Sequence, residues 1–231
     1  MLINLRNALM AGKRKQTAKD YVQSGLIAMW DGIENAGWGV HDANATVWKD
    51  LTGNGYDFVK IGAITRWAED AAVFDGSNNN GPEGWNIDGI LTLEVVGISE
   101  LSSFFAFSLH TSGTQPRKMF SILPAGNRGF QFADSAPSMF KDWSSARWSV
   151  AATWSNSDKQ DAQYYNGQFA PSNSGTSGWS VPRNSAILGR HSNDQYKYKG
   201  ELCCIRAYSR ALAADEIAAN YAVDKARFGL P

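Results

Sequence analysis

The chain has 231 residues, enough for one large all-β domain or two small ones. Lysine plus arginine equal aspartate plus glutamate at 22 each, so no net charge attracts nucleic acid or an anionic membrane. Apolar residues make up 43% of the sequence and can fill a core, while 22 glycines provide turns between short strands, so an all-β domain is favoured.

The first 20 residues are predicted to form a short arm before the domain. Apolar residues at near-helical spacing are followed directly by a basic cluster. The residues assigned to docking are Leu2, Leu5, Leu9, Lys13, Arg14 and Lys15. Two interpretations stay open: a frayed terminus, or a helix that buries its leucines in a larger assembly. The basic cluster comes after the apolar stretch, the wrong order for a signal peptide, and no apolar run is long enough to cross a membrane.

From residue 21 onward, short apolar runs alternate with Gly, Asn, Asp and Ser at a spacing typical of a β-sandwich. Strands are predicted at 26–30, 46–48, 71–74, 91–95, 104–109, 119–123, 129–132, 148–154, 162–165, 185–188 and 202–208. Asn166-Gly167 predicts a two-residue type I′ hairpin. No repeat or linker divides this region, so residues 171–178 are predicted to be a long loop within one domain.

One helix is predicted over residues 213–225, with Asp215 and Glu216 in a first turn that favours negative charge. The residues on its apolar face are Leu212, Ile217, Ala218 and Tyr221. We expect this helix to close one end of the sandwich.

Cys203 and Cys204 are neighbours in the sequence, and adjacent residues of a strand point to opposite faces, so both are predicted to be free thiols. Free thiols without an export signal indicate folding in a reducing cytoplasm, even for a protein that later works outside the cell.

Five motifs, taken in order, resemble the laminin-G-like branch of the concanavalin A-like lectin and glucanase superfamily. They are the strand 26–30, the segment 48–55, which is similar to a W-x-D-x-S-G-N-G turn, and the segments 73–77, 164–168 and 200–221. The resemblance covers residues 25–228 and implies an all-β, two-sheet antiparallel jelly-roll sandwich over residues 21–231, after the helical arm and with one C-terminal helix. The family usually has Ser or Thr before the final helix, where this chain has Ala213, so the helix is expected to lack its usual N-cap.

The motif residues also have a direct physical interpretation. The glycines of the Gly53-Asn54-Gly55 turn permit a positive φ, and Asp50 can cap the amides of that turn. Arg206 alternates with apolar residues and can hold a neighbouring loop by charge-assisted hydrogen bonds.

The sequence does not favour catalysis. Retaining glycosidases carry two carboxylates about 5 Å apart, and on this fold these often come from a Glu-x-Asp-x-Glu strand, which is absent here. The nearest candidates, Glu69-Asp70, Glu94 and Glu100, are interpreted as turn or solvent-face charges. The three histidines, His41, His110 and His191, lie far apart without local partners. We therefore expect a protein that is not an enzyme, with a glycoside hydrolase as the second alternative.

A structural calcium ion is a weaker hypothesis, and no cofactor is required. Loop oxygens that can bind Ca²⁺ are carried by Asp50, Asn54, Asp57 and Asp75. Asp and Asn also occupy turns for backbone reasons alone, which is the favoured interpretation.

Nine tryptophans occur in the chain. Those on predicted strands, expected in the core, are Trp30, Trp48, Trp148 and Trp154. The loop candidates for ligand binding are Trp38, Trp85, Trp143 and Trp179, with the polar neighbours Arg190, Asn193 and Asp194. The alternative is that these loop tryptophans plug the ends of the sandwich.

The predicted function is a non-catalytic binding or adhesion module for a glycan or cell-surface polymer. Domains that resemble this one occur in phage and gut-bacterial surface proteins, which implies display on a bacteriophage virion as a capsid decoration, fibre or tail component. The arm would contact other virion or surface proteins, and the chain can form a homo-oligomer. The alternatives are a purely structural virion protein without glycan binding, and a bacterial cell-surface or secreted location.

Overall fold

A computed structural model describes residues 15–59, 64–77, 90–99, 107–110, 146–155, 160–170, 185–188 and 197–231. The described elements are η1 (Ala18–Asp20), β1 (Leu26–Asp31), β2 (Arg66–Ala68), β3 (Ala71–Asp75), β4 (Thr92–Ser99), β5 (Phe107–His110), β6 (Trp148–Ser155), β7 (Gln160–Tyr165), β8 (Gln168–Ala170), β9 (Ser185–Leu188), β10 (Lys199–Tyr208) and α2 (Ala214–Phe228).

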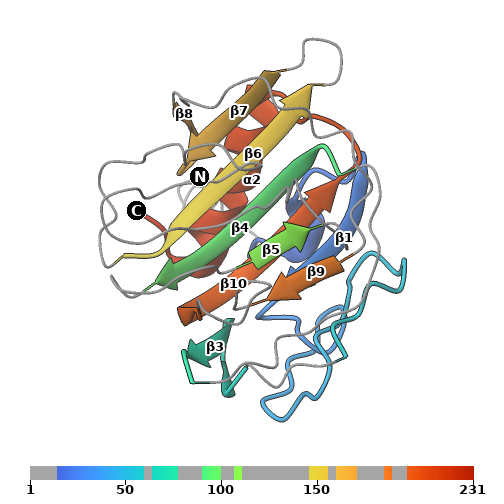
Figure 1. The fold of residues 1–231 in the computed structure, drawn as a ribbon, viewed down its shortest axis with the longest axis vertical. Coiled ribbons are helices and arrows are strands. Elements are labelled where there is room, and N and C mark those ends of the chain that lie inside the picture. The colour runs from blue at the N-terminus through green and yellow to red at the C-terminus, as the bar shows by residue number, and fades with distance from the viewer. Residues whose placement is uncertain are drawn as a thin grey trace, which may run out of the picture.

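The strands form two antiparallel sheets (Figure 1). The main sheet has the order β2-β3-β10-β4-β6-β7-β8, and the second sheet pairs β5 with β9. The long strand β10 lies at the centre, with β4 along one side. Its other side pairs first with β3 and then with β1. This arrangement confirms the predicted all-β sandwich with one C-terminal helix.

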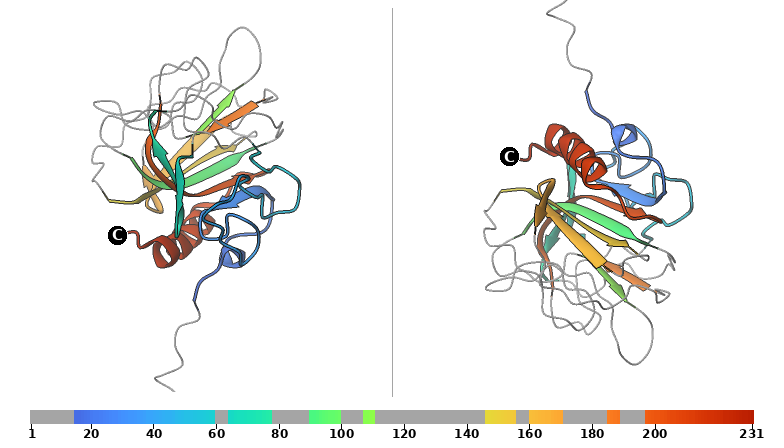
Figure 2. Two further views of the ribbon diagram at one scale, coloured as in Figure 1. Left: turned by 90° about the horizontal axis from the view of Figure 1, so that it is seen from below. Right: turned by 90° about the horizontal axis from the view of Figure 1, so that it is seen from above.

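The main sheet is covered on both faces. Figure 2 shows β5 and β9 on one side of it, and α2 with η1 on the other. We call the face toward β9 the inner face and the face toward α2 the outer face. The inner face is apolar and buries Trp30, Leu93, Val95, Trp148 and Ile205 together with Leu188 of β9. Three of the four tryptophans expected in the core, Trp30, Trp48 and Trp148, are fully buried there.

The predicted position of the C-terminal helix is wrong. The helix runs along the outer face of the sheet and does not close an end (Figure 2). Its buried side chains are Ile217, Asn220, Val223, Asp224 and Phe228. Ala218 is exposed and Tyr221 is half-buried, so the predicted apolar face is only partly correct. Two inward positions, Asn220 and Asp224, are polar, so the spacing of apolar residues does not reveal them.

Local turn chemistry agrees with the predictions. Asn166 and Gly167 have φ values of 48° and 73°, as a type I′ turn requires, and they join β7 to β8. At the start of α2, Ala213 makes no side-chain cap, and the Glu216 carboxylate instead accepts a bond from the Ala213 amide at 2.9 Å. Both cysteines are free and buried, as expected.

Other predictions differ from the structure or concern residues outside its described part. The predicted strand at 46–48 is reduced to one bridge between Trp48 and Phe58. Strands β2 and β8 were not predicted. The predicted strands at 119–123 and 129–132 lie outside the described residues, as do Leu2, Leu5, Leu9, Lys13 and Arg14.

The described part of the N-terminal segment packs on the domain. Lys15 is exposed, whereas Ala18 is fully buried in an apolar cluster with Met29 and Val223. The predicted boundary between arm and domain, at residue 20, falls at the end of this packed turn.

Candidate functional site

The loop after β1 presents an exposed aromatic side chain. Trp38 is 41% exposed and Val40 is 51% exposed. The flanking glycines, Gly37 and Gly39, have φ values of 131° and 71°, a region that residues with a Cβ rarely adopt. The amide of Val40 donates to the Gly37 carbonyl at 2.9 Å and closes the turn. Trp38 therefore stands at the tip of a tight, hydrogen-bonded turn.

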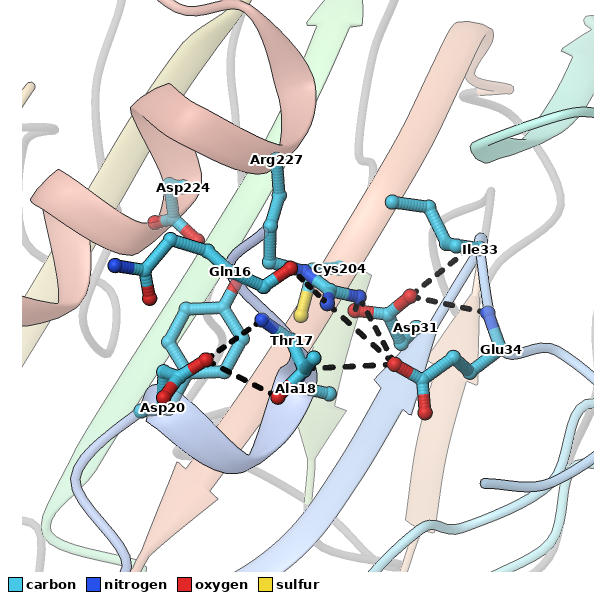
Figure 3. A network of polar contacts seen from close by, with 12 residues as sticks. Gln16, Thr17, Ala18, Asp20, Asp31, Ile33, Glu34, Cys204, Asp224 and Arg227 are labelled. Carbon is cyan, nitrogen blue, oxygen red and sulfur yellow. Dashed lines mark hydrogen bonds and ion pairs between the residues drawn. The ribbon is translucent and has the colours of Figure 1, made fainter. Parts of the chain in front are cut away.

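The side chain of Glu34 holds this turn in place. Its side chain is largely buried, and its Oε2 accepts a hydrogen bond from the Gly39 amide at 2.9 Å. Its Oε1 lies 3.4 Å from the Ala18 amide and from the Arg227 guanidinium (Figure 3). One carboxylate therefore joins the loop that carries Trp38, the N-terminal turn and helix α2.

Asp31, at the end of β1, supports Glu34. Asp31 Oδ1 accepts bonds from the amides of Ile33 and Glu34 at 2.9 and 3.1 Å, and its Oδ2 pairs with Arg227 at 2.7 Å (Figure 3). Burial raises the pKa of Asp31 to about 6, although the nearby Arg227 guanidinium opposes that rise. Asp31 is therefore ionised and paired at neutral pH.

The side-chain amide of Asn35 holds the end of the loop at Asp42. Asn35 donates to the Asp42 carbonyl and accepts from the Asp42 amide, both at 2.8 Å. His41 Nδ1 lies 3.0 Å from the Gly32 carbonyl. The loop is therefore braced at both ends before any ligand arrives.

A second exposed side chain reaches Trp38 from another segment. Lys19 belongs to η1, and its Nζ lies 5.2 Å from the centroid of the Trp38 ring. This spacing is within the range of a cation–π contact. The candidate site is therefore the surface formed by Lys19, Trp38 and Val40.

A network of buried charges lies between the main sheet and α2. Arg206 of β10 pairs with Glu94 of β4 at 2.7 Å and with Asp224 of α2 at 2.7 and 2.8 Å, and all three side chains are buried. Asn220 donates to Glu94 at 2.8 Å, and the Tyr21 hydroxyl donates to Asp224 at 2.8 Å. Burial raises the pKa of Glu94. The network attaches α2 and the N-terminal segment to the sheet.

Two sequence interpretations change as a result. The prediction that Glu94 is a solvent-face charge is wrong, because α2 covers the face on which Glu94 lies. Arg206 makes charge-assisted bonds as expected, but its partners belong to a strand and a helix and not to a neighbouring loop.

The residues proposed for calcium make hydrogen bonds within the chain. Asp50 accepts bonds from the amides of Met29 and Thr52 at 3.0 Å, which confirms its predicted role in capping the turn. Each of the others also has a hydrogen bond: Asp57 to Lys49 and to the Asp50 amide, Asn54 to the Ile27 carbonyl, and Asp75 to Ser77. Among the described residues, no group of three His, Cys, Asp or Glu side chains is arranged to hold a metal ion. Calcium binding stays a prediction.

Of the predicted ligand-binding residues, only Trp38 lies in the described part of the chain. Those outside it are Trp85, Trp143, Trp179, Arg190, Asn193 and Asp194. Lys19 was not predicted as a site residue, because nothing in the local pattern places it beside Trp38. Phe169 was not predicted either; it is 63% exposed on the edge strand β8 and contacts the ring of Tyr164.

Solved structures with a similar fold include sialidases. Trypanosoma rangeli sialidase in complex with sialic acid matches with a TM-score of 0.63 and 18% identity, and a second structure of that sialidase has a TM-score of 0.65 at 18% identity. Both matches cover 87% of this chain and 33% of the sialidase chain, so this protein spans about a third of their length. The CBM40 of Ruminococcus gnavus IT-sialidase, bound to α2,3 sialyllactose, gives a TM-score of 0.49 at 16% identity over 65% of this chain and 95% of that one.

Comparison with curated proteins gives no match. In the described part of the chain, no helix is long and apolar enough to span a membrane. A family model described as "Concanavalin A-like lectin/glucanases superfamily" matches residues 58–218. Because this match covers well over half of the chain, and the sandwich fold agrees with it, the protein belongs to the concanavalin A-like lectin/glucanase superfamily.

Proposed function

We propose that this protein is a non-catalytic carbohydrate-binding module whose ligand contacts Trp38. The observation that carries the proposal is the exposed indole of Trp38 on a braced turn. A flat aromatic face packs well against the apolar face of a sugar ring, and a side chain that is already ordered loses little entropy on binding. The family description, which names lectins, supports a carbohydrate ligand.

The buried charges support a role without catalysis. Most glycoside hydrolases use two carboxylates that flank the substrate. Glu94 and Asp224 are brought together around Arg206, but both are buried between the main sheet and α2, where a saccharide cannot reach them. Their role in this proposal is to hold the helix and the N-terminal segment.

A glycan array tests the proposal with wild-type protein, Trp38→Ala and the matched control Phe169→Ala. Phe169 is another exposed aromatic residue, but it lies on the edge strand β8 and not in the loop that carries Trp38. We expect saccharide signals that Trp38→Ala abolishes and Phe169→Ala retains. A blank array would favour the alternative of a purely structural protein, and signals that survive Trp38→Ala would exclude this site.

Display on a larger assembly, such as a bacteriophage virion, is the second part of the proposal. Many copies on one particle would make weak individual contacts effective through avidity. Removal of residues 1–15 leaves the packed turn at Ala18 intact, so the truncated chain should stay folded. Light scattering should give a larger mass than one chain for the full-length protein and a monomer for the truncated one. Monomers in both cases would contradict docking through the arm.

A further inference from the structure

The candidate site combines an apolar surface with a positive charge. Trp38 and Val40 come from the loop after β1, whereas Lys19 comes from the turn before β1. Both segments are attached to Glu34, through the Gly39 amide at 2.9 Å and the Ala18 amide at 3.4 Å. The backbone position of Lys19 relative to the indole is therefore set by the fold.

The turn that carries Lys19 is anchored on both sides of this residue. Ala18 is fully buried, and the hydroxyl of Tyr21 donates to Asp224 at 2.8 Å. The Val22 amide also donates to Asn220 at 2.8 Å. These contacts fix the backbone of Lys19, so only its exposed side chain has to be ordered when a ligand binds.

The positive charge of Lys19 is not neutralised by a carboxylate of the described residues. Its neighbour Asp20 accepts bonds from the amide and hydroxyl of Thr17 at 2.7 and 3.1 Å. Glu34 is bound to Gly39 and Arg227, and Arg227 also pairs with Asp31. The acids around η1 therefore have other partners, while Lys19 contacts the face of Trp38.

We infer that the ligand of this site is an acidic saccharide, with a sugar ring against Trp38 and a carboxylate at the Lys19 ammonium. This inference rests on the proposed function. Because Nζ lies over the ring, 5.2 Å from its centroid, a sugar that packs on the part of the indole left exposed has its ring substituents within reach of the ammonium. A carboxylate there gains a charge-assisted hydrogen bond, whereas a neutral sugar does not. Uronic and sialic acids both supply this chemistry.

Calorimetric titration with two matched pairs of probes tests the inference and separates the two sources. The first pair is oligogalacturonate and its full methyl ester, and the second is 3′-sialyllactose and lactose. In at least one pair the acid should bind about tenfold more tightly than the neutral probe, as expected for a charge-assisted bond, and 0.5 M salt should weaken this preference. The pair that shows the preference identifies the acid as a uronic or a sialic acid.

Three variants assign the effect to Lys19. Lys19→Met keeps an apolar side chain over the indole. It should remove the preference of about tenfold for the acidic probe and leave the affinity for the neutral probe unchanged. Lys19→Arg should retain it within about twofold because the charge remains. Lys49→Met, which changes an exposed lysine that pairs with Asp57, is the control and should behave like wild type.

The results distinguish failure of this inference from failure of the proposed function. If Trp38→Ala abolishes binding while Lys19→Met binds acidic and neutral probes like wild type, recognition of an acid by Lys19 is excluded and the carbohydrate site stands. If neither probe pair binds, the acidic-saccharide inference is overturned and the glycan array decides the proposed function; if Trp38→Ala has no effect on binding, both proposals are overturned.

Discussion

The two faces of the main sheet are built from the same strands but are stabilised by different chemistry. On the inner face, neighbouring strands bury tryptophan and aliphatic side chains against β9. On the outer face, the alternate positions of these strands carry Asp31, Glu94, Ser149 and Arg206, all buried. Strands that alternate between apolar and polar residues usually have one face in water. Here a helix covers the outer face, where the buried polar residues lie among apolar ones such as Met29 and Val96, and its own Asn220 and Asp224 complete the hydrogen bonds.

The largest expected effect comes from removal of the central cation of the outer face. Arg206→Met leaves the carboxylates of Glu94 and Asp224 buried without their partner, and we expect a loss of about 3–5 kcal/mol in the free energy of unfolding. Urea denaturation measures it. Lys49→Met, which breaks an exposed ion pair with Asp57, should cost less than about 1 kcal/mol.

Equal losses in the two variants would show that the outer-face pairs are not effectively buried. If Arg206→Met fails to fold, Arg206→Lys gives a second measurement. It retains the charge but loses the bidentate contact with Asp224, so it should lie between the wild type and the methionine variant.

The outer face should also make stability depend on pH. Burial raises the pKa of Asp31 to about 6 in the folded protein, above the value near 4 expected when the chain is unfolded. The folded state therefore binds more protons between these values, so the contribution of Asp31 to stability is complete below about pH 4 and is lost as the pH rises through 6. Between pH 4 and pH 7, the free energy of unfolding of the wild type should fall by about 2–3 kcal/mol relative to that of Asp31→Asn. Urea denaturation across this pH range measures the difference.

Glu216 supplies a control of opposite sign. Hydrogen bonds from Arg210 lower its pKa to about 2, so its contribution is present above the unfolded value and is lost as the pH falls through 2. Because the Glu216 side chain is partly exposed, the destabilisation by Glu216→Gln should be small; it should be present at neutral pH and disappear as the pH falls through 2. Parallel curves for the wild type and Asp31→Asn would refute the assignment to Asp31.

The inner face could be predicted from sequence because its signals are local. Along β4 and β6, the apolar residues that face the core stand two positions apart, with mostly polar residues between them. The Asn166-Gly167 pair determines the hairpin between β7 and β8. The apolar members of these strands are therefore found in the core. These signals depend only on neighbours in sequence.

The outer face and the candidate site could not be predicted in the same way. Arg206 and Glu94 are 112 residues apart, and no local pattern connects them. Tyr21 and Asp224 are 203 residues apart. The Lys19 to Trp38 contact likewise depends on how η1 packs on the sheet. Trp38 itself was assigned to a loop because it lies between Gly37 and Gly39 in the sequence.

A smaller effect is expected for the residue beside Arg206 on β10. Ile205 points to the inner face, and Ile205→Val removes one methylene group from a close-packed cluster. We expect a loss of about 1 kcal/mol in the free energy of unfolding, measured under the same urea conditions as Arg206→Met. A larger loss for Ile205→Val than for Arg206→Met would reverse the comparison between the two faces.

The smallest expected effect is a gain at the helix that covers the outer face. Ala213 has the extended backbone of an N-cap but no side-chain oxygen, so Ala213→Ser adds an acceptor for a first-turn amide. We expect a gain of about 0.5 kcal/mol, at the low end for such caps, because the Glu216 amide already bonds to Asp215. In the Arg206→Met background, the gain should persist if α2 stays docked without its buried charge pair, since independent effects add. A gain that disappears there, with amide exchange of α2 accelerated, would show that the buried charges are what hold the helix against the sheet.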